Sequence, residues 1–316
     1  MRAAVVRELG SPPEIGEVRD PEASGGRTVL DVVAAGLNPI DVAVGAGRYF
    51  AGHPQLPYVS GAEGVARADD GTLLYLNGDG LGVSRDGAHA ERALFAPVEA
   101  LPVPDGLEPE LAAACGIAGL AGWLPFAWRA PVREGETVLV LGATGTVGLV
   151  AVQAAKLLGA GRVVAAGRNE AALQRAAERG ADETVRLQEG LDLVAAFRAA
   201  CGGDGPSLVF DPLWGAPGAA AVEAAARGAR IVNLGQSAGP EATLRSGDVR
   251  GKGLDLLGYT NFAVPREVRE REYTRLCRHV AAGDVRIDVE SVPLDDLPTA
   301  WERQASSPNV KLVVTP

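Results

Sequence analysis

The feature that most constrains this chain is a glycine-rich turn near its middle. The turn reads Gly142-Ala143-Thr144-Gly145-Thr146-Val147-Gly148, and it lies between an apolar run at 137–141 and a helical pattern at 145–158. A strand, a turn with this glycine spacing and a helix together predict a dinucleotide-binding site, with a purely structural turn as the alternative. Gly142 permits the tight turn, Gly145 lets the backbone approach a pyrophosphate, and Gly148 lets helix and strand pack closely. The unpaired N–H groups at the start of the helix would face the phosphates.

Around this turn, apolar strands alternate with alanine-rich helices. The expected strands are 137–141, 162–166, 208–211, 230–234 and 254–259, and the expected helices are 145–158, 170–179, 191–200 and 216–226. Strands that are apolar throughout and alternate with helices predict a parallel sheet covered on both faces. The first hundred residues differ, because short apolar runs at 28–34, 71–76 and 91–96 are separated by Gly, Pro and Asp. We therefore expect a mostly β domain followed by an α/β domain, then a charged helix at 266–281 and a last strand at 311–315 that returns to the first domain.

The residues after the second strand of the α/β region indicate which nucleotide binds. In NAD sites an Asp or Glu about 20 residues beyond the turn accepts the ribose hydroxyls. Here the run 162–166 ends in Gly167-Arg168-Asn169, with no acid at its tip. Because a guanidinium pairs with a phosphate that a carboxylate would repel, we predict that these three residues border the adenosine ribose and that the cofactor is NADP(H). The alternative is that Arg168 is a solvated surface residue and Asn169 only caps the next helix.

Composition argues against several other classes of protein. The formal net charge is −10, which disfavours a broad basic surface for nucleic acid. The three cysteines are odd in number and widely spaced, so we predict no disulfide framework. The uncharged run 111–128 is rich in Ala and Gly and contains Pro125, so we interpret it as one or two buried helices and predict no membrane association. Arg7 and Glu8 lie where a secretory apolar region would run, and we expect a cytoplasmic protein.

Short motifs along nearly the whole chain carry a family resemblance. They include Ala35-Gly36-Leu37-Asn38-Pro39-Ile40-Asp41, Gly45-x-Gly47-Arg48-Tyr49, Gly61-Ala62-Glu63-Gly64, Gly87-Ala88-His89-Ala90-Glu91, Val209-Phe210-Asp211-Pro212 and Lys311-Leu312-Val313-Val314. Their order and spacing resemble the medium-chain dehydrogenase/reductase superfamily, and within it the zinc-independent quinone oxidoreductase branch that includes zeta-crystallin. The resemblance implies an α/β fold in which a Rossmann domain with a doubly wound parallel sheet, residues 121–261, follows a mostly β, GroES-like catalytic domain, residues 1–120, with residues 262–316 returning to the latter.

The same resemblance bears on metal and catalysis. Zinc-dependent relatives place a Cys where Asn38 stands and a His where Ala62 stands, and the three histidines of this chain are scattered, so we predict no metal site. The resemblance implies that Asn38, Asp41 and Tyr49 lie near the nicotinamide and substrate. Tyr49 would donate a hydrogen bond to an oxygen that gains charge, and Asn38 would orient the nicotinamide ribose or the substrate. The alternatives are that Asn38, which precedes Pro39, is an ordinary turn residue and that Asp41 caps the following helix.

By resemblance, further residues that follow strands would face the cofactor. These are Leu234, Gly235, Tyr259 and Asn261, whose backbone groups would hold the carboxamide at the edge where open parallel sheets bind ligands. The strand at 254–259 would lie at a sheet edge and pair with its counterpart in a homodimer; alternatively the chain itself covers that edge.

The function expected from these features is hydride transfer from NADPH to a small molecule, either a quinone or an α,β-unsaturated carbonyl. One alternative is a serine esterase, because Gly235-Gln236-Ser237-Ala238-Gly239 follows an apolar strand as a hydrolase nucleophile does, although no strong helix pattern follows at 240–252. Another alternative is a protein that binds NADPH without catalysis. A short-chain dehydrogenase would need a Tyr-x-x-x-Lys pair, which the chain does not contain.

Overall fold

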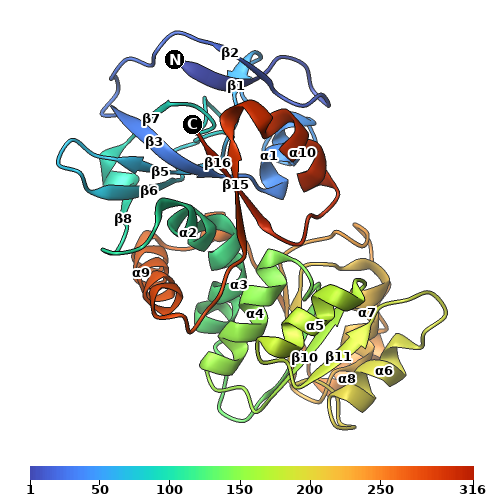
Figure 1. Cartoon of the computed structure of the whole chain (residues 1–316). Coiled ribbons are helices and arrows are strands. Elements are labelled where there is room, and N and C mark those ends of the chain that lie inside the picture. The colour runs from blue at the N-terminus through green and yellow to red at the C-terminus, as the bar shows by residue number, and fades with distance from the viewer. The chain divides into compact units, whose positions relative to one another are not determined.

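The computed structural model describes all residues, 1–316, and they form two units that we describe separately. The first unit comprises Met1–Ala118, Tyr273–Gly283 and Ile287–Pro316. The second comprises Gly119–Glu272 and Asp284–Arg286. Both termini of the chain lie in the first unit (Figure 1).

The second unit is built on a six-stranded sheet in which every neighbouring pair is parallel. Its order is β11 (Glu183–Arg186), β10 (Arg162–Gly167), β9 (Thr137–Leu141), β12 (Leu208–Asp211), β13 (Arg230–Asn233) and β14 (Asp255–Gly258). This is the strand order of a dinucleotide-binding fold, and the chain reverses its direction of winding between β9 and β12. The predicted α/β class with a doubly wound parallel sheet is confirmed.

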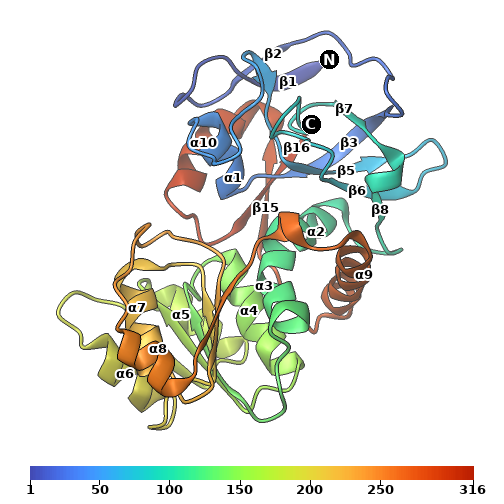
Figure 2. The same cartoon turned by 180° about the vertical axis from the view of Figure 1, so that it is seen from behind.

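Helices cover both sides of this sheet, as Figures 1 and 2 show. They are α3 (Leu120–Leu124), α4 (Thr146–Leu157), α5 (Glu170–Glu178), α6 (Leu193–Ala200), α7 (Gly215–Ala224) and α8 (Ser246–Lys252). α4 packs with α3 and α5, and α6 packs with α7. Since the sheet is covered twice, the side chains of Val138 to Leu141 are all buried, which is why the strand reads as one continuous apolar run.

The first unit is mostly β, as expected for a GroES-like domain. One sheet follows the path β15 (Val289–Pro293), β16 (Lys311–Thr315), β3 (Thr28–Gly36), β5 (Glu63–Arg67), β6 (Leu73–Asn77) and β8 (Leu101–Pro102), with β7 (Arg92–Phe95) also paired to β3. A second sheet contains β2 (Glu14–Glu17), β1 (Arg2–Val6) and β4 (Tyr58–Val59). The helices are α1 (Pro39–Gly45), α2 (Pro109–Ala114), α10 (Leu297–Ala305) and the second half of α9 (Arg266–Ala282). A core that includes Leu37, Phe95 and Leu312 joins α10 to the larger sheet.

One sequence expectation was wrong in this part of the structure. We saw no strong helix signal between Pro240 and Lys252, yet α8 occupies the end of that stretch. The helix has only seven residues, it is rich in Gly and charged side chains, and Gly253 in the left-handed conformation ends it. Local propensity therefore gave little warning of it.

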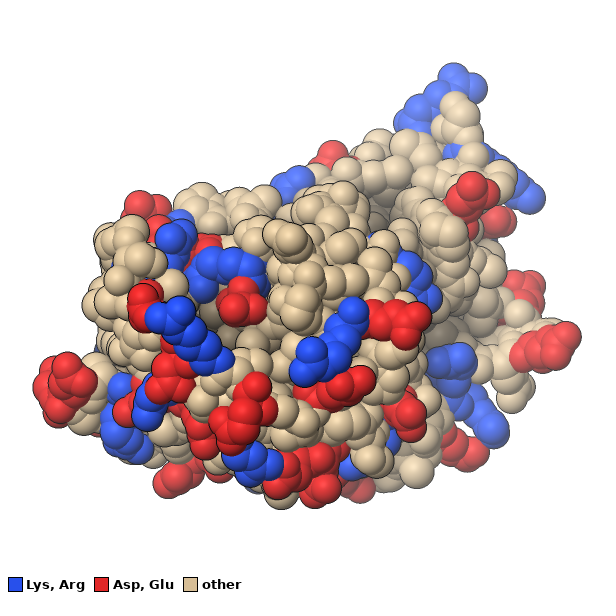
Figure 3. Space-filling view, turned by 90° about the horizontal axis from the view of Figure 1, so that it is seen from above, with Lys and Arg blue, Asp and Glu red and all other residues tan.

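The uncharged run near residue 120 is helical but interrupted. The stretch Pro109–Arg129 is long and apolar enough to cross a membrane, and 72% of its most apolar window is buried within the protein. Gly116, with φ −65° and ψ −122°, departs from helical geometry inside it. Such burial is what a core helix of a folded domain shows. On the face drawn in Figure 3, acidic and basic side chains are interspersed, without a large area of one sign.

Candidate functional site

The glycines of the predicted nucleotide turn do three different things in the second unit. Gly142 follows β9 with φ +64°, and a Cβ on it would lie 3.0 Å from Cγ of Pro212. A Cβ on Gly148 would overlap the carbonyl oxygen of Gly142, so this glycine permits α4 to pack against the turn. A Cβ on Gly145 would have no neighbour closer than 4.0 Å, so this position faces open space. Only the middle glycine leaves room for a ligand.

This arrangement fits a pyrophosphate. Gly145 is the N-cap residue of the 12-residue helix α4, which begins at Thr146. The first N–H groups of a helix have no partner within it, and they attract anions. The backbone of residues 142–148 would thus hold the diphosphate of a dinucleotide, with the open side of Gly145 as the approach.

Arg168 lies beside this turn as a free cation. The turn contacts the end of β10, because Ala143 N–H donates to Ala166 O at 3.0 Å and a Cβ on Gly167 would meet the side chain of Thr144. Arg168 is the next residue; it is exposed and makes no ion pair or hydrogen bond. A guanidinium at this place is suited to a phosphate on the adenosine ribose.

Asn169 performs the structural role that the sequence left open for it. Its Oδ1 accepts a hydrogen bond from Ala172 N–H at 3.1 Å and caps the start of α5. The cap fixes the turn that carries Arg168. A contact of Asn169 with a cofactor stays a prediction.

The other residues predicted to face the cofactor follow β13 and β14. Leu234 and Gly235 come directly after β13, and a Cβ on Gly235 would lie 2.5 Å from Pro212 O, so the ends of β12 and β13 touch. Tyr259 follows β14 and donates its hydroxyl hydrogen to Oδ1 of Asn261. Burial raises the pKa of Tyr259, so its hydroxyl stays protonated at neutral pH. These loops lie at the carboxyl edge of the sheet, the edge that also carries residues 142–148.

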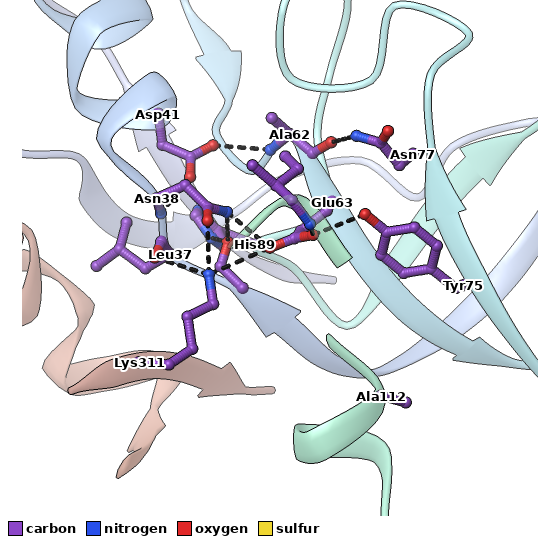
Figure 4. Close-up of polar contacts among 12 residues, drawn as sticks. Leu37, Asn38, Asp41, Ala62, Glu63, Tyr75, Asn77, His89, Ala112 and Lys311 are labelled. Atoms are coloured by element: carbon purple, nitrogen blue, oxygen red, sulfur yellow. Dashed lines mark hydrogen bonds and ion pairs between the residues drawn. The ribbon is translucent and has the colours of Figure 1, made fainter. Parts of the chain in front are cut away.

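In the first unit, a buried polar cluster surrounds Glu63 (Figure 4). Its carboxylate accepts hydrogen bonds from Tyr75 Oη at 2.8 Å, from Asn38 Nδ2 at 2.7 Å and from Ile117 N–H at 2.6 Å. Lys311 Nζ lies 3.2 Å from Oε1 of Glu63, and the two side chains are 3% and 0% exposed. We call Asn38, Glu63, Tyr75 and Lys311 the Glu63 cluster. It joins β5, β6 and β16 to the start of α1.

Asn38 and Asp41 are held by this part of the protein. Asn38 Nδ2 also donates to Gly36 O at 3.1 Å, and its Oδ1 accepts from Lys311 Nζ at 2.6 Å. Asp41 accepts from Asn38 N–H at 2.7 Å and from Ala62 N–H at 2.8 Å, one to each oxygen. Burial raises the pKa of Asp41 to about 7, against these two hydrogen bonds and the charge of Lys311. All polar atoms of both side chains are therefore used inside the protein, which is the turn and cap chemistry named above as the alternative.

Tyr49 lies elsewhere, in a half-buried position after α1. Its ring is 4.6 Å from that of Phe50, and it packs on the apolar group formed by Val6, Val44 and Tyr58. Partial burial raises the pKa of Tyr49, which keeps the phenol protonated and able to donate. Of the three predicted catalytic residues, Tyr49 is the one with surface toward solvent.

Sequence reasoning assigned no role to three residues around Glu63. Tyr75 and Lys311 contact its carboxylate, and buried His89 lies 3.0 Å from Ser60 Oγ through Nδ1. Burial lowers the pKa of His89 to about 3, so the ring is neutral. The available signal was one acid and one lysine inside otherwise apolar runs, Glu63 and Lys311, whose charges are opposite.

The structure shows no arrangement that matches either a metal site or the active site of a serine hydrolase. The structure assembles no group of three His, Cys, Asp or Glu side chains that could hold a metal ion. A hydrolase nucleophile lies on a sharp turn between a strand and a helix. Ser237 instead donates its hydroxyl hydrogen to Pro212 O at 3.3 Å, and the next helix begins only at Ser246.

The similarities to known proteins agree with this geometry. Residues 146–277 match the family model described as "Zinc-binding dehydrogenase". The chain is 31% identical to quinone oxidoreductase-like protein 2 of Rattus norvegicus over 264 residues, 81% of this chain and 74% of that protein. A solved structure titled as an NAD-dependent alcohol dehydrogenase is 30% identical with a TM-score of 0.89, and the match covers 100% of both chains. Quinone oxidoreductase from Thermus thermophilus, solved also in complex with NADPH, is 28% identical with a TM-score of 0.83, again over 100% of both chains. With these matches and the fold described above, the chain belongs to the medium-chain dehydrogenase/reductase superfamily, in its zinc-independent quinone oxidoreductase branch.

Proposed function

We propose that this oxidoreductase uses NADPH to reduce a quinone or an α,β-unsaturated carbonyl compound. The observation that carries the choice of nucleotide is the unpaired guanidinium of Arg168, beside a turn whose middle glycine faces open space. The Thermus thermophilus relative, which was crystallised with NADPH, supports the proposal. Because another similar structure is titled as an NAD-dependent alcohol dehydrogenase, the test compares both nucleotides.

Within this proposal, the backbone of residues 142–148 binds the diphosphate, and Arg168 neutralises the 2′-phosphate. Leu234, Gly235, Tyr259 and Asn261 border the nicotinamide end. When bound, the nucleotide supplies the hydride.

Tyr49 is the proposed hydrogen-bond donor to the substrate oxygen, which gains negative charge during reduction. Its raised pKa favours the protonated phenol at the pH of assay. Asn38 and Asp41 enter as positioning residues, because their polar atoms are occupied; they anchor the start of α1, the helix that leads to Tyr49.

The test is oxidation of NADPH and of NADH against a panel of quinones, enones and aldehydes. We expect turnover with NADPH and a quinone or enone, and a kcat at least tenfold lower in Tyr49→Phe, on the order of what a positioned proton donor contributes. Tyr58→Phe is the matched control, because this neighbouring hydroxyl is buried without a partner. Tight NADPH binding with no turnover on any acceptor would replace the proposal with that of a nucleotide-binding sensor.

We also propose that two copies of the chain associate through β14. This strand is at the sheet edge, and its Leu256 is 43% exposed. Exposed edge strands readily pair with another strand, and a second β14 would extend the sheet.

A further inference from the structure

A second arginine, Arg186, lies close to Arg168 at the end of the adjacent strand. β10 and β11 pair in parallel, and the register places Arg186 opposite Gly167, the residue before Arg168. Leu187 N–H also donates to Gly167 O at 2.8 Å, so the pairing continues to the very end of both strands. Neighbouring strands lie about 4.8 Å apart, so the two arginines start from adjacent points of one sheet edge.

Arg186 is not free, because Glu170 holds it. Arg186 Nη1 lies 3.0 Å from Oε2 of Glu170 at the first turn of α5, and the side chains are 55% and 78% exposed. An exposed pair of this kind is weak, so its partners can exchange. A phosphate monoester carries about −1.5 to −2 charges at neutral pH and offers three acceptor oxygens, which makes it a stronger partner for a guanidinium than one carboxylate.

We infer that Arg186 is a second binding residue for the 2′-phosphate of the cofactor, and that it leaves Glu170 to bind it. The inference rests on the proposed function, since it concerns the same nucleotide. With Arg168 and Arg186 together, the phosphate meets two cations from adjacent strands. Glu170 then opposes the phosphate as a like charge, and it is the acid nearest along the chain to the tip of β10. Selection between NADPH and NADH thus depends on three residues rather than on Arg168 alone.

The experiment measures the dissociation constants of NADP⁺ and NAD⁺ by isothermal titration calorimetry, without turnover. The ratio of the two constants isolates the contribution of the 2′-phosphate. We expect Arg186→Gln to weaken NADP⁺ binding about tenfold, as loss of one charge-assisted contact does, and to change NAD⁺ binding less than about twofold. Glu170→Gln should tighten NADP⁺ binding about threefold, because it removes a like charge.

The chain contains a matched control for both substitutions. Arg162 and Glu183, the first residues of β10 and β11, form an ion pair of 3.4 Å. Arg162 lies about 16 Å from Gly167 along β10, and Glu183 lies about 10 Å from Arg186 along β11. Both separations exceed the Debye length of about 8 Å at physiological salt. Arg162→Gln and Glu183→Gln should leave the ratio of dissociation constants unchanged.

Failure of the inference and failure of the proposed function give different results. If the wild type prefers NADP⁺ and Arg168→Gln abolishes the preference while Arg186→Gln leaves it unchanged, Arg186 has no part in binding the phosphate and the inference is wrong. If the wild type binds neither nucleotide, or binds NAD⁺ more tightly, the proposed nucleotide itself is wrong and the inference goes with it. The melting temperature of each variant is measured to check that the variant is folded.

Discussion

Removal of the ammonium group of Lys311 should lower the free energy of unfolding of the first unit far more than removal of an exposed cation. In the native structure this ammonium contacts the carbonyl oxygen of Leu37, Oδ1 of Asn38 and Oε1 of Glu63 at 3.1, 2.6 and 3.2 Å, all of them buried. Lys311→Met keeps most of the length of the side chain but leaves a carboxylate buried without its counterion. Loss of one partner of a buried ion pair costs about 3–5 kcal/mol.

The double substitution shows whether charge is the cause. Glu63→Gln together with Lys311→Met removes both charges, so we expect the pair to cost about 1–3 kcal/mol less than the sum of the single changes. Arg303→Met is the exposed control in the same unit, because Arg303 pairs with Glu290 through two contacts of 2.6 and 2.8 Å at the surface. It should change the stability far less.

The assay is urea unfolding followed by circular dichroism. Hydrogen exchange in β3 and β16 assigns the transition that belongs to the first unit. The reasoning is refuted if Lys311→Met lowers the free energy of unfolding by less than about 1.5 kcal/mol, or if the effects of the single substitutions simply add. A buried carboxylate without its counterion should destabilise the fold by more than that.

Three further predictions concern other positions. Gly145→Ala should weaken binding of NADP⁺ at least about tenfold by calorimetry with little change in melting temperature, whereas Gly148→Ala should destabilise the fold by about 1–3 kcal/mol, because only its Cβ overlaps backbone. Tyr58→Phe should stabilise the protein to urea by about 1 kcal/mol, since it removes a buried hydroxyl that has no partner; a loss of stability would show that the hydroxyl is bonded. Leu256→Lys should shift sedimentation from dimer to monomer, and an unchanged sedimentation coefficient would exclude β14 as the interface.

Most strands of the nucleotide-binding sheet could be predicted closely, because burial on both faces leaves a pattern in the local sequence of each strand. β9 and β12 have the bounds that their apolar runs indicated, since a strand buried on both faces must be apolar at nearly every position. β11 was not predicted, because it lies at the sheet edge and reads Glu-Thr-Val-Arg, with only Val185 buried. An edge strand meets solvent, so its sequence carries no comparable pattern.

The Glu63 cluster was beyond sequence reasoning for a different reason. A lysine is rarely buried, and Lys311 is 3% exposed only because acceptors from the end of β3, from the start of α1 and from β5 converge on it. Glu63 is 248 residues away along the chain. No local pattern reports a pairing at that separation. The motifs that contain Asn38, Glu63 and Lys311 were all visible in the sequence, but the contact between their side chains was not.

The position of β16 has a consequence for how the chain matures. This strand lies inside the larger sheet of the first unit, parallel to β15 and antiparallel to β3. During synthesis it leaves the ribosome after all of the nucleotide-binding unit, most of which is the continuous stretch 119–272. We therefore expect the Rossmann unit to become protease-resistant first, while the end of β3, at Ala35 and Gly36, lacks its antiparallel partner until β16 emerges.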